Sequence, residues 1–255
     1  MAQSIEGWYY GLPYLTRFYL TVCFLSTCLS SLGFVNPRSL YLDFDLVWDR
    51  FQLWRLPTSF MYLGGFGFPF LMQLMILTNY SSRLEEDPFP GGGGPTADYA
   101  FMLFFGACVL WVIAFFMELP FLGSALIFMI VYVWSRRNPT VPVAIWGFQF
   151  QGLYLPWALI AFTVLMGGSP MMDIFGVIAG HLYYFLLEVL PTTKGWNLLQ
   201  TPSFFATLFP SPQAFGATPI IGARGPAGTA AAAAAGGGGG GGGYAWGTGR
   251  PLGRD

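Results

Sequence analysis

The chain has 255 residues, of which 55% are hydrophobic, 19% aromatic and 9% charged, and its mean hydropathy is +0.56. Soluble domains carry about a quarter charged residues, so this composition excludes an ordinary soluble protein and predicts a polytopic membrane protein in contact with the lipid bilayer. The net charge of −1 provides no basic surface for nucleic acid, which we exclude as a partner.

The first predicted span runs from about Tyr14 to Val35. Residues 36–56 then mix apolar and aromatic side chains with acids and arginines, a pattern typical of an amphipathic element lying in the membrane interface. This stretch ends in Trp54, an amphipathic ring, and Arg55, a permanent cation with five donors. An ordinary interfacial Trp beside a snorkelling Arg is the alternative interpretation of the pair.

The second predicted span, about Pro57 to Tyr80, contains Gly64, Gly65, Gly67 and Pro69. A helix with these residues kinks or unwinds, either as a mobile gate or where small residues let helices pack closely. Residues 81–96 are acidic and contain four consecutive glycines, which predicts a solvated connection.

Three further apolar stretches and a last span complete the pattern. The stretch 99–117 is uncharged and of ordinary spanning length, whereas 121–134 is marginally short, which suits a central helix surrounded by longer ones. The stretch 140–166 is interrupted by prolines and glycines, so only its second half is convincingly apolar. With the last span at 171–190, six spans place both termini on one side, and the Lys/Arg distribution supports this only weakly.

The last span carries Gly176 and Gly180, a small-xxx-small pair that lets two helices approach closely. His181 follows directly and is the only histidine of the chain. An intramembrane His is a functional candidate, and a neutral His hydrogen-bonded within the bundle is the alternative.

Together, the Trp-Arg pair, the six spans and the GxxxG pair resemble the rhomboid superfamily. The strings TADY at 96–99, YVWSRR at 132–137, YLPW at 154–157 and GHLYYFL at 180–186 are similar to segments of the Derlin family, particularly its Derlin-1-like members. The resemblance covers about residues 1–210. It implies an all-α membrane domain, a six-transmembrane-helix rhomboid-like bundle with an interfacial first loop that Trp54 and Arg55 anchor.

An active rhomboid protease is the alternative, with Ser124 as nucleophile and His181 as base. Ser124 lies in Leu-Gly-Ser-Ala, which lacks both glycines of the family's GxSG motif, and the family's histidine position, three residues before its GxxxG, is Asp173 here. His181 is eight residues further on, about 12 Å along the helix. We therefore predict a pseudoprotease with no catalytic residue, cofactor or metal.

Resemblance to the Derlins implies a non-enzymatic component of endoplasmic-reticulum-associated degradation that helps misfolded proteins cross to the cytosol. Short or broken spans would thin the bilayer, and Gln149, Gln151 and His181 would line a polar substrate path. The expected location is the endoplasmic reticulum membrane, multi-pass with both termini cytosolic. Expected partners are misfolded ER proteins, a membrane-embedded ubiquitin ligase complex and other copies or relatives in a homo- or hetero-oligomer.

The tail has a composition of its own. Residues 211–243 end in six alanines and eight glycines, which predicts a disordered linker, and its part from Gly216 to Gly243 would be a tether reaching about 30 Å. Residues 244–255 follow, and Trp246, Gly247, Gly249 and Leu252 are similar to the SHP box of Derlin tails. That resemblance implies binding to the valosin-containing AAA+ ATPase, and a low-complexity remnant is the alternative.

Overall fold

The computed structural model describes residues 5–209 except 88, 146 and 197–198. The chain divides into two units, Met1–Gly216 and Ala217–Asp255, and every described residue belongs to the first. The predicted tether at 211–243 and the terminal motif at 244–255 lie outside the described residues.

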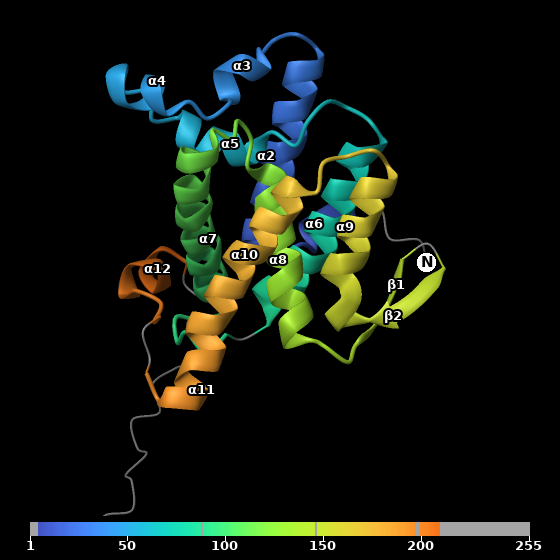
Figure 1. The fold of residues 1–255 in the computed structure, drawn as a ribbon, viewed down its shortest axis with the longest axis vertical. Helices are drawn as coiled ribbons and strands as arrows, with labels where there is room; N and C mark the ends of the chain where they lie inside the picture. The colour runs from blue at the N-terminus through green and yellow to red at the C-terminus, as the bar shows by residue number, and fades with distance from the viewer. Residues whose placement is uncertain (1–4, 88, 146, 197–198, 210–255) are drawn as a thin grey trace, which may run out of the picture. The chain divides into compact units, whose positions relative to one another are not determined.

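The described residues form a bundle of helices with one short β-hairpin at its side (Figure 1). A 3-10 turn, Gly152–Tyr154, leads into α9, and a π-helical segment, Phe185–Val189, joins α10 to α11. The bounds of the other elements are α1 (Ile5–Tyr10), α2 (Tyr14–Ser31), α3 (Pro37–Leu40), α4 (Phe44–Asp49), α5 (Arg55–Met61), α6 (Phe68–Glu86), α7 (Pro95–Met117), α8 (Gly123–Arg137), β1 (Pro142–Ile145), β2 (Phe148–Gln151), α9 (Leu155–Leu165), α10 (Met171–Tyr184), α11 (Leu190–Lys194) and α12 (Ser203–Leu208).

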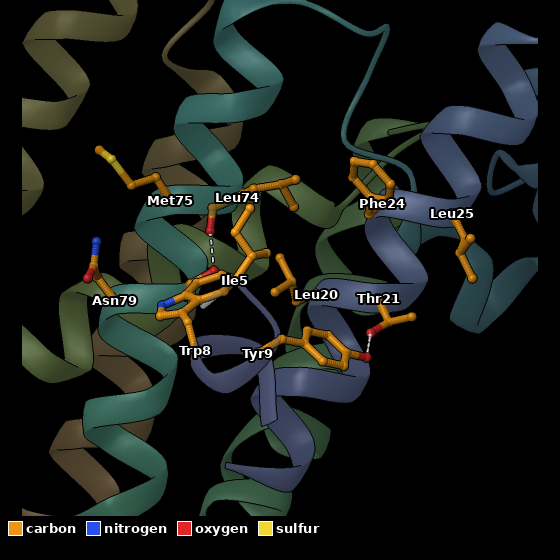
Figure 2. Close-up of a pocket in the computed structure, with 11 residues that line it drawn as sticks. Ile5, Trp8, Tyr9, Leu20, Thr21, Phe24, Leu25, Leu74, Met75 and Asn79 are labelled. Carbon is orange, nitrogen blue, oxygen red and sulfur yellow. Dashed lines mark hydrogen bonds between the residues drawn. The ribbon is translucent and has the colours of Figure 1, made fainter. Parts of the chain in front are cut away.

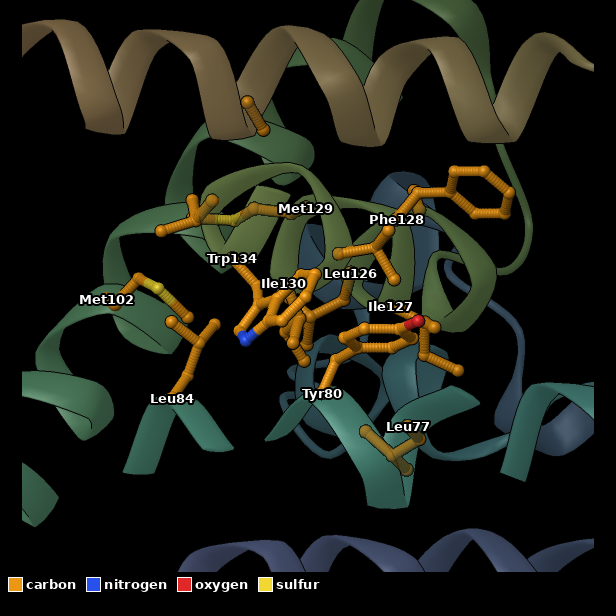
Figure 3. Close-up of a cluster of buried hydrophobic side chains, with 14 of the residues drawn as sticks. Leu77, Tyr80, Leu84, Met102, Leu126, Ile127, Phe128, Met129, Ile130 and Trp134 are labelled. Atoms are coloured by element: carbon orange, nitrogen blue, oxygen red, sulfur yellow. The ribbon is translucent and has the colours of Figure 1, made fainter. Parts of the chain in front are cut away.

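Helix α8 is the centre of the bundle. It has fifteen residues, and twelve of them are buried. Figure 3 shows its side chains Leu126, Ile130 and Trp134 packed among residues of α6 and α7, such as Tyr80 and Met102. Because α8 is apolar around its whole circumference, it is stable only when neighbours enclose it. The prediction of a short central helix is confirmed.

Some helices of the bundle have the length and composition of membrane-spanning helices. Two helical stretches among the described residues, Pro95–Met117 and Met171–Lys194, are long and apolar enough to cross a membrane by length and composition. The rings of Tyr14 and Phe209 lie 6.5 Å apart, so the start of α2 and the residue after α12 lie together at one end of the bundle. An even number of crossings requires this arrangement, and the number six itself stays a prediction.

The predicted interruption of the second span is present. Helix α5 ends at Met61 and α6 begins at Phe68, with Gly64 at φ +110° between them. Helix α6 continues to Glu86, however, so the prediction of a solvated connection from residue 81 was wrong for its first six residues. Ser81 and Glu85 are buried because they face the N-terminal turn of α2.

Residues 142–151 also differ from the sequence interpretation. Strands β1 and β2 pair antiparallel, with Pro142 opposite Gln151 and Ala144 opposite Gln149, and Gly147 in the turn has φ +86°. The expected first half of a span is therefore a hairpin whose ladder satisfies its backbone groups. The apolar second half forms α9, as predicted, with Pro156 in the first turn, where its missing N–H is not needed.

Candidate functional site

Arg55 joins the first loop to the bundle. Its side chain is buried, and Nη1 donates to the carbonyl oxygens of Arg38 (3.0 Å) and Tyr41 (2.9 Å). Nε donates to Oε1 of Gln52 at 2.7 Å, and the guanidinium lies 5.1 Å from the centre of the Tyr41 ring. One planar cation thus holds α3, the loop after it and the start of α5, and the carbonyl contacts expected for Arg55 are present.

Trp54 does not share this role. Its side chain is 55% exposed, and only its carbonyl oxygen is used, accepting from N and Oγ1 of Thr58. Thr58 Oγ1 also lies 3.1 Å from the carbonyl oxygen of Leu40, which ties α5 to α3. The exposed ring suits the membrane interface, so the two residues of the pair act differently.

Gly176 and Gly180 are the points of contact between α10 and α8. A Cβ on Gly176 would meet the carbonyl oxygen of Ala125, which is backbone and cannot move aside. A Cβ on Gly180 would lie 3.1 Å from the carbonyl oxygen of Met129 and 3.0 Å from Cδ1 of Tyr132. The glycines therefore allow the two helix backbones to touch, as the small-xxx-small pattern indicates.

A cavity of about 270 Å³ lies between α6, α8, α9 and the start of α10. Its walls are mostly apolar. Gln73, Ser124 and Asp173 line it from three different helices, and Thr163 and Ser169 are its other polar residues. The start of α6 and the loop before α10, which both contribute to its lining, lie at the end of the bundle where α3, α4 and α5 lie (Figure 1). This convergence makes the cavity the candidate functional site.

Ser124 and Gln73 are bonded to each other. Nε2 of Gln73 donates to Oγ of Ser124 at 2.9 Å, whereas Oε1 of Gln73 is buried without a hydrogen-bond partner. Ser124 is the second residue of α8, so its backbone starts a regular helix instead of making the tight turn of a GxSG motif.

The third polar residue, Asp173, is 3% exposed, and its Oδ2 also lacks a hydrogen-bond partner. It lies in the first turn of α10, where a negative charge is favoured by the helix dipole. The sequence analysis named Asp173 only as the residue at the family's histidine position, and it assigned neither Gln73 nor Asp173 to a site. Polar residues inside apolar segments are the signal that could have found them.

His181 does not approach Ser124. Its Nδ1 lies 2.7 Å from the hydroxyl oxygen of Tyr132, and its side chain is exposed. Tyr132 is eight residues beyond Ser124 on α8, a separation of about 12 Å along the helix axis. The structure therefore brings Ser124 together with Gln73 and His181 together with Tyr132, and it assembles no Ser–His pair from these two residues.

The remaining residues named from the sequence lie elsewhere. Gln149 and Gln151 are exposed on strand β2, outside the helices of the bundle, and their part in a substrate path stays a prediction. Trp246, Gly247, Gly249 and Leu252 lie outside the described residues.

A larger groove, about 760 Å³, lies between α1, α2 and α6 (Figure 2). Ile5, Trp8 and Phe24 are among its mainly apolar walls, and the hydroxyl groups of Tyr9 and Thr21 bond to each other at 2.7 Å. None of its lining residues has a buried side-chain polar atom without a hydrogen-bond partner. The groove therefore gives less indication of a particular ligand than the cavity at Asp173 does.

Apolar helices around a short buried helix, with a mostly apolar cavity that a few polar side chains line, define a helical-bundle membrane protein. The Der1-like family matches residues 12–203 of the chain. Derlin-2.2 of Arabidopsis thaliana is 42% identical over 221 residues, covering 82% of this chain and 89% of the relative, and Derlin-1 of the same plant is 41% identical over 206 residues, covering 79% and 76%. A probable derlin-2 homolog of Dictyostelium discoideum is 38% identical over 216 residues, covering 82% and 84%.

The chain therefore belongs to the Der1-like, or Derlin, family. It is about equally similar to Derlin-1 and Derlin-2 relatives. The family membership confirms the resemblance noted from the sequence and agrees with the membrane character of the bundle.

Proposed function

We propose that this Derlin acts without catalysis in endoplasmic-reticulum-associated degradation, where it helps misfolded proteins cross the membrane to the cytosol. Family membership supports the general role. The observation that carries the mechanism is the shortness of two neighbouring helices, α8 and α9.

Helix α8 has 15 residues, which at 1.5 Å per residue corresponds to a length of about 22 Å. Helix α9 has 11 residues, and with the 3-10 turn before it also reaches about 22 Å. The hydrocarbon core of a bilayer is about 30 Å thick. Because α9 has exposed apolar residues such as Trp157 (59% exposed) and Leu165 (82% exposed), lipid beside it must thin to match.

The cavity adds polar groups to this thinned region. Gln73, Ser124 and Asp173 offer hydrogen-bonding atoms beside α9. A thinner bilayer with polar groups at its edge lowers the cost of carrying polar chain through hydrocarbon. We therefore assign the polar substrate path to Gln73, Ser124 and Asp173. The sequence had predicted Gln149, Gln151 and His181 for this role.

Partners follow from the same role. Trp246 and Leu252 of the tail would fill apolar pockets of the amino-terminal domain of the valosin-containing ATPase, with Gly247 and Gly249 permitting close backbone approach. The tether would hold that motor at high local concentration near the bilayer exit. A membrane-embedded ubiquitin ligase complex, further copies or relatives of this chain, and multi-pass insertion with both termini cytosolic complete the proposal.

The alternative function, proteolysis, is not favoured. The hydroxyl of Ser124 is hydrogen-bonded to Gln73 and not to a histidine. The side chain of His181 is held by Tyr132 on another part of α8.

The experiment is a chase of a misfolded lumenal protein in cells that depend on this chain. Removal of the chain should lengthen the half-life of that protein, and a chain with His181→Ala, which lacks the only histidine, should restore degradation as fully as the wild type. An unchanged half-life after removal would refute the role in degradation. Loss of a cleavage product in Ser124→Ala would refute the non-enzymatic mechanism.

A further inference from the structure

Asp173 is an acid for which the fold provides too few donors. It is the third residue of α10, the position from which an acidic side chain often reaches back to the N–H of the N-cap residue. The N-cap here is Pro170, which has no N–H, so this bond cannot form. Thr163 contacts the carboxyl group of Asp173 through a side-chain hydrogen bond, and the same hydroxyl also lies 3.2 Å from the carbonyl oxygen of Leu159, so its one proton is shared. Oδ2 of Asp173 consequently lies buried without a hydrogen-bond partner.

Gln73 leaves a second polar atom unpartnered at the same cavity. Its amide has a single bond, to Ser124, and the other end, Oε1, is buried without a partner. Rotating the amide would exchange its two ends and still leave one of them unpaired. Burying a polar group without a partner costs free energy, so two such groups lining one cavity indicate a ligand that completes them.

The other walls define what that ligand is. Among the residues that line the cavity, Asp173 is the only one with an ionisable side chain, and none is basic. Aromatic side chains, including Phe68, Phe128 and Phe162, form much of the surface. The volume of about 270 Å³ lies below the usual range of whole small-molecule pockets, about 300–1,000 Å³, and suits a single side chain.

The mouth of the cavity is bordered by residues that face outward from the bundle. Phe68 at the start of α6 is 53% exposed, and Met166 after α9 is 54% exposed. A segment lying in the bilayer against α6 and α9 would therefore reach the cavity with one side chain, without opening the helices around α8.

We propose that the Asp173 cavity binds the ammonium of a lysine or the guanidinium of an arginine in the membrane-crossing segment of a client protein. The cation donates to Oδ2 of Asp173 and to Oε1 of Gln73, and its aliphatic stem lies against the aromatic walls. A basic residue is expensive in hydrocarbon, so a segment that carries one gains from a partner at this depth. The inference rests on the proposed function and specifies one class of its clients: proteins whose membrane-crossing segment carries a misplaced basic residue.

The test uses the full-length chain in phosphatidylcholine nanodiscs and apolar transmembrane peptides with a photoreactive group. One peptide carries a single lysine near the depth of the cavity, and two matched peptides carry leucine or glutamate there. Wild-type chain should bind the lysine peptide about tenfold more tightly than either control. Asp173→Asn should remove this preference, whereas Glu86→Gln, which neutralises an exposed acid at the far end of α6, should keep it.

Equal binding of the three peptides by the wild-type chain would overturn the proposal, and this comparison needs no variant. If Asp173→Asn fails to fold, Asp173→Glu keeps the charge and should retain a preference for lysine over leucine.

Degradation assays separate this inference from the general function. Removal of the whole chain should stabilise clients with and without a membrane-embedded lysine, but Asp173→Asn should stabilise only the former. If removal affects both clients and Asp173→Asn affects neither, the inference is wrong and the general function stands. If removal affects neither client, the general function is wrong, and the peptide measurement still decides what the cavity binds.

Discussion

Glu85, near the end of α6, caps the N-terminus of α2 through Thr16. Oε2 of Glu85 accepts from both N and Oγ1 of Thr16 at 2.8 Å, and Oε1 accepts from N of Leu15 at 2.9 Å. The N-cap residue of α2 is Pro13, which supplies no side-chain cap. A carboxylate from another helix, 69 residues away in sequence from Thr16, therefore satisfies the exposed amides of α2.

The hydrogen bond between Thr16 and Glu85 is part of a buried chain of hydrogen-bonded hydroxyl groups. Oγ of Ser81 lies 2.7 Å from Oγ1 of Thr16 and also bonds the hydroxyl of Tyr99 on α7. Since Thr16 donates its one hydroxyl proton to Glu85, Ser81 must donate to Thr16 and Tyr99 to Ser81. Three helices are thus connected by one oriented network.

Replacing Glu85 tests this network. Glu85→Gln removes one acceptor and places an amide donor against the N–H groups of α2, so the free energy of unfolding should fall by about 2 kcal/mol. Thermal melting in detergent measures the loss. The adjacent Glu86→Gln, at an exposed position, should change stability by less than about 0.5 kcal/mol. Equal melting temperatures for the two variants would contradict a capping role.

Arg55→Lys should destabilise the first loop although it keeps the charge. An ammonium cannot replace the planar guanidinium that serves Arg38, Tyr41 and Gln52 together. We expect a loss of about 2 kcal/mol and faster amide hydrogen exchange in residues 37–43. Arg50→Lys is the control, because Arg50 is exposed. Unchanged stability and normal client degradation in Arg55→Lys would exclude the anchoring role.

The two glycines of α10 should differ in their tolerance of a methyl group. Gly176→Ala places its Cβ against the carbonyl oxygen of Ala125 and should cost about 1–3 kcal/mol. Gly180→Ala meets atoms at 3.0 Å or more and should cost less. Val177→Leu, on the same helix, is the control and should be the mildest. Melting temperatures in detergent rank the three, and an inverted order would show that the α8–α10 contact does not set stability.

The tail should bind the ATPase on its own, because its motif is a short stretch of consecutive residues. A peptide of residues 244–255 should bind the amino-terminal domain of the valosin-containing ATPase. Trp246→Ala with Leu252→Ala should weaken binding by at least about tenfold. In the full chain, the same double change should leave the melting temperature of the membrane domain unaltered. Wild-type affinity in the double variant would refute the assignment.

The sequence by itself determined the elements whose residues carry a strong local signal. The end of α7 at Met117 and the short apolar α8 follow from runs of apolar residues, and the break before Phe68 follows from glycines and Pro69. The Trp-Arg and GxxxG motifs identified the family, and the contacts of Arg55 with loop carbonyls were predicted correctly. In each case neighbouring residues in the chain contain the information.

Only the tertiary structure decided which polar residues meet. Glu85 was assigned to a solvated connection because its sequence neighbours are polar. In the structure it is buried, and it accepts hydrogen bonds from backbone amides of α2 that would otherwise be unsatisfied. The hairpin at 142–151 was mistaken for part of a span, since a short apolar run does not distinguish strand from helix. Gln73 and Asp173 are a hundred residues apart, and their convergence on one cavity depends on how α6 and α10 pack around α8, which no local pattern encodes.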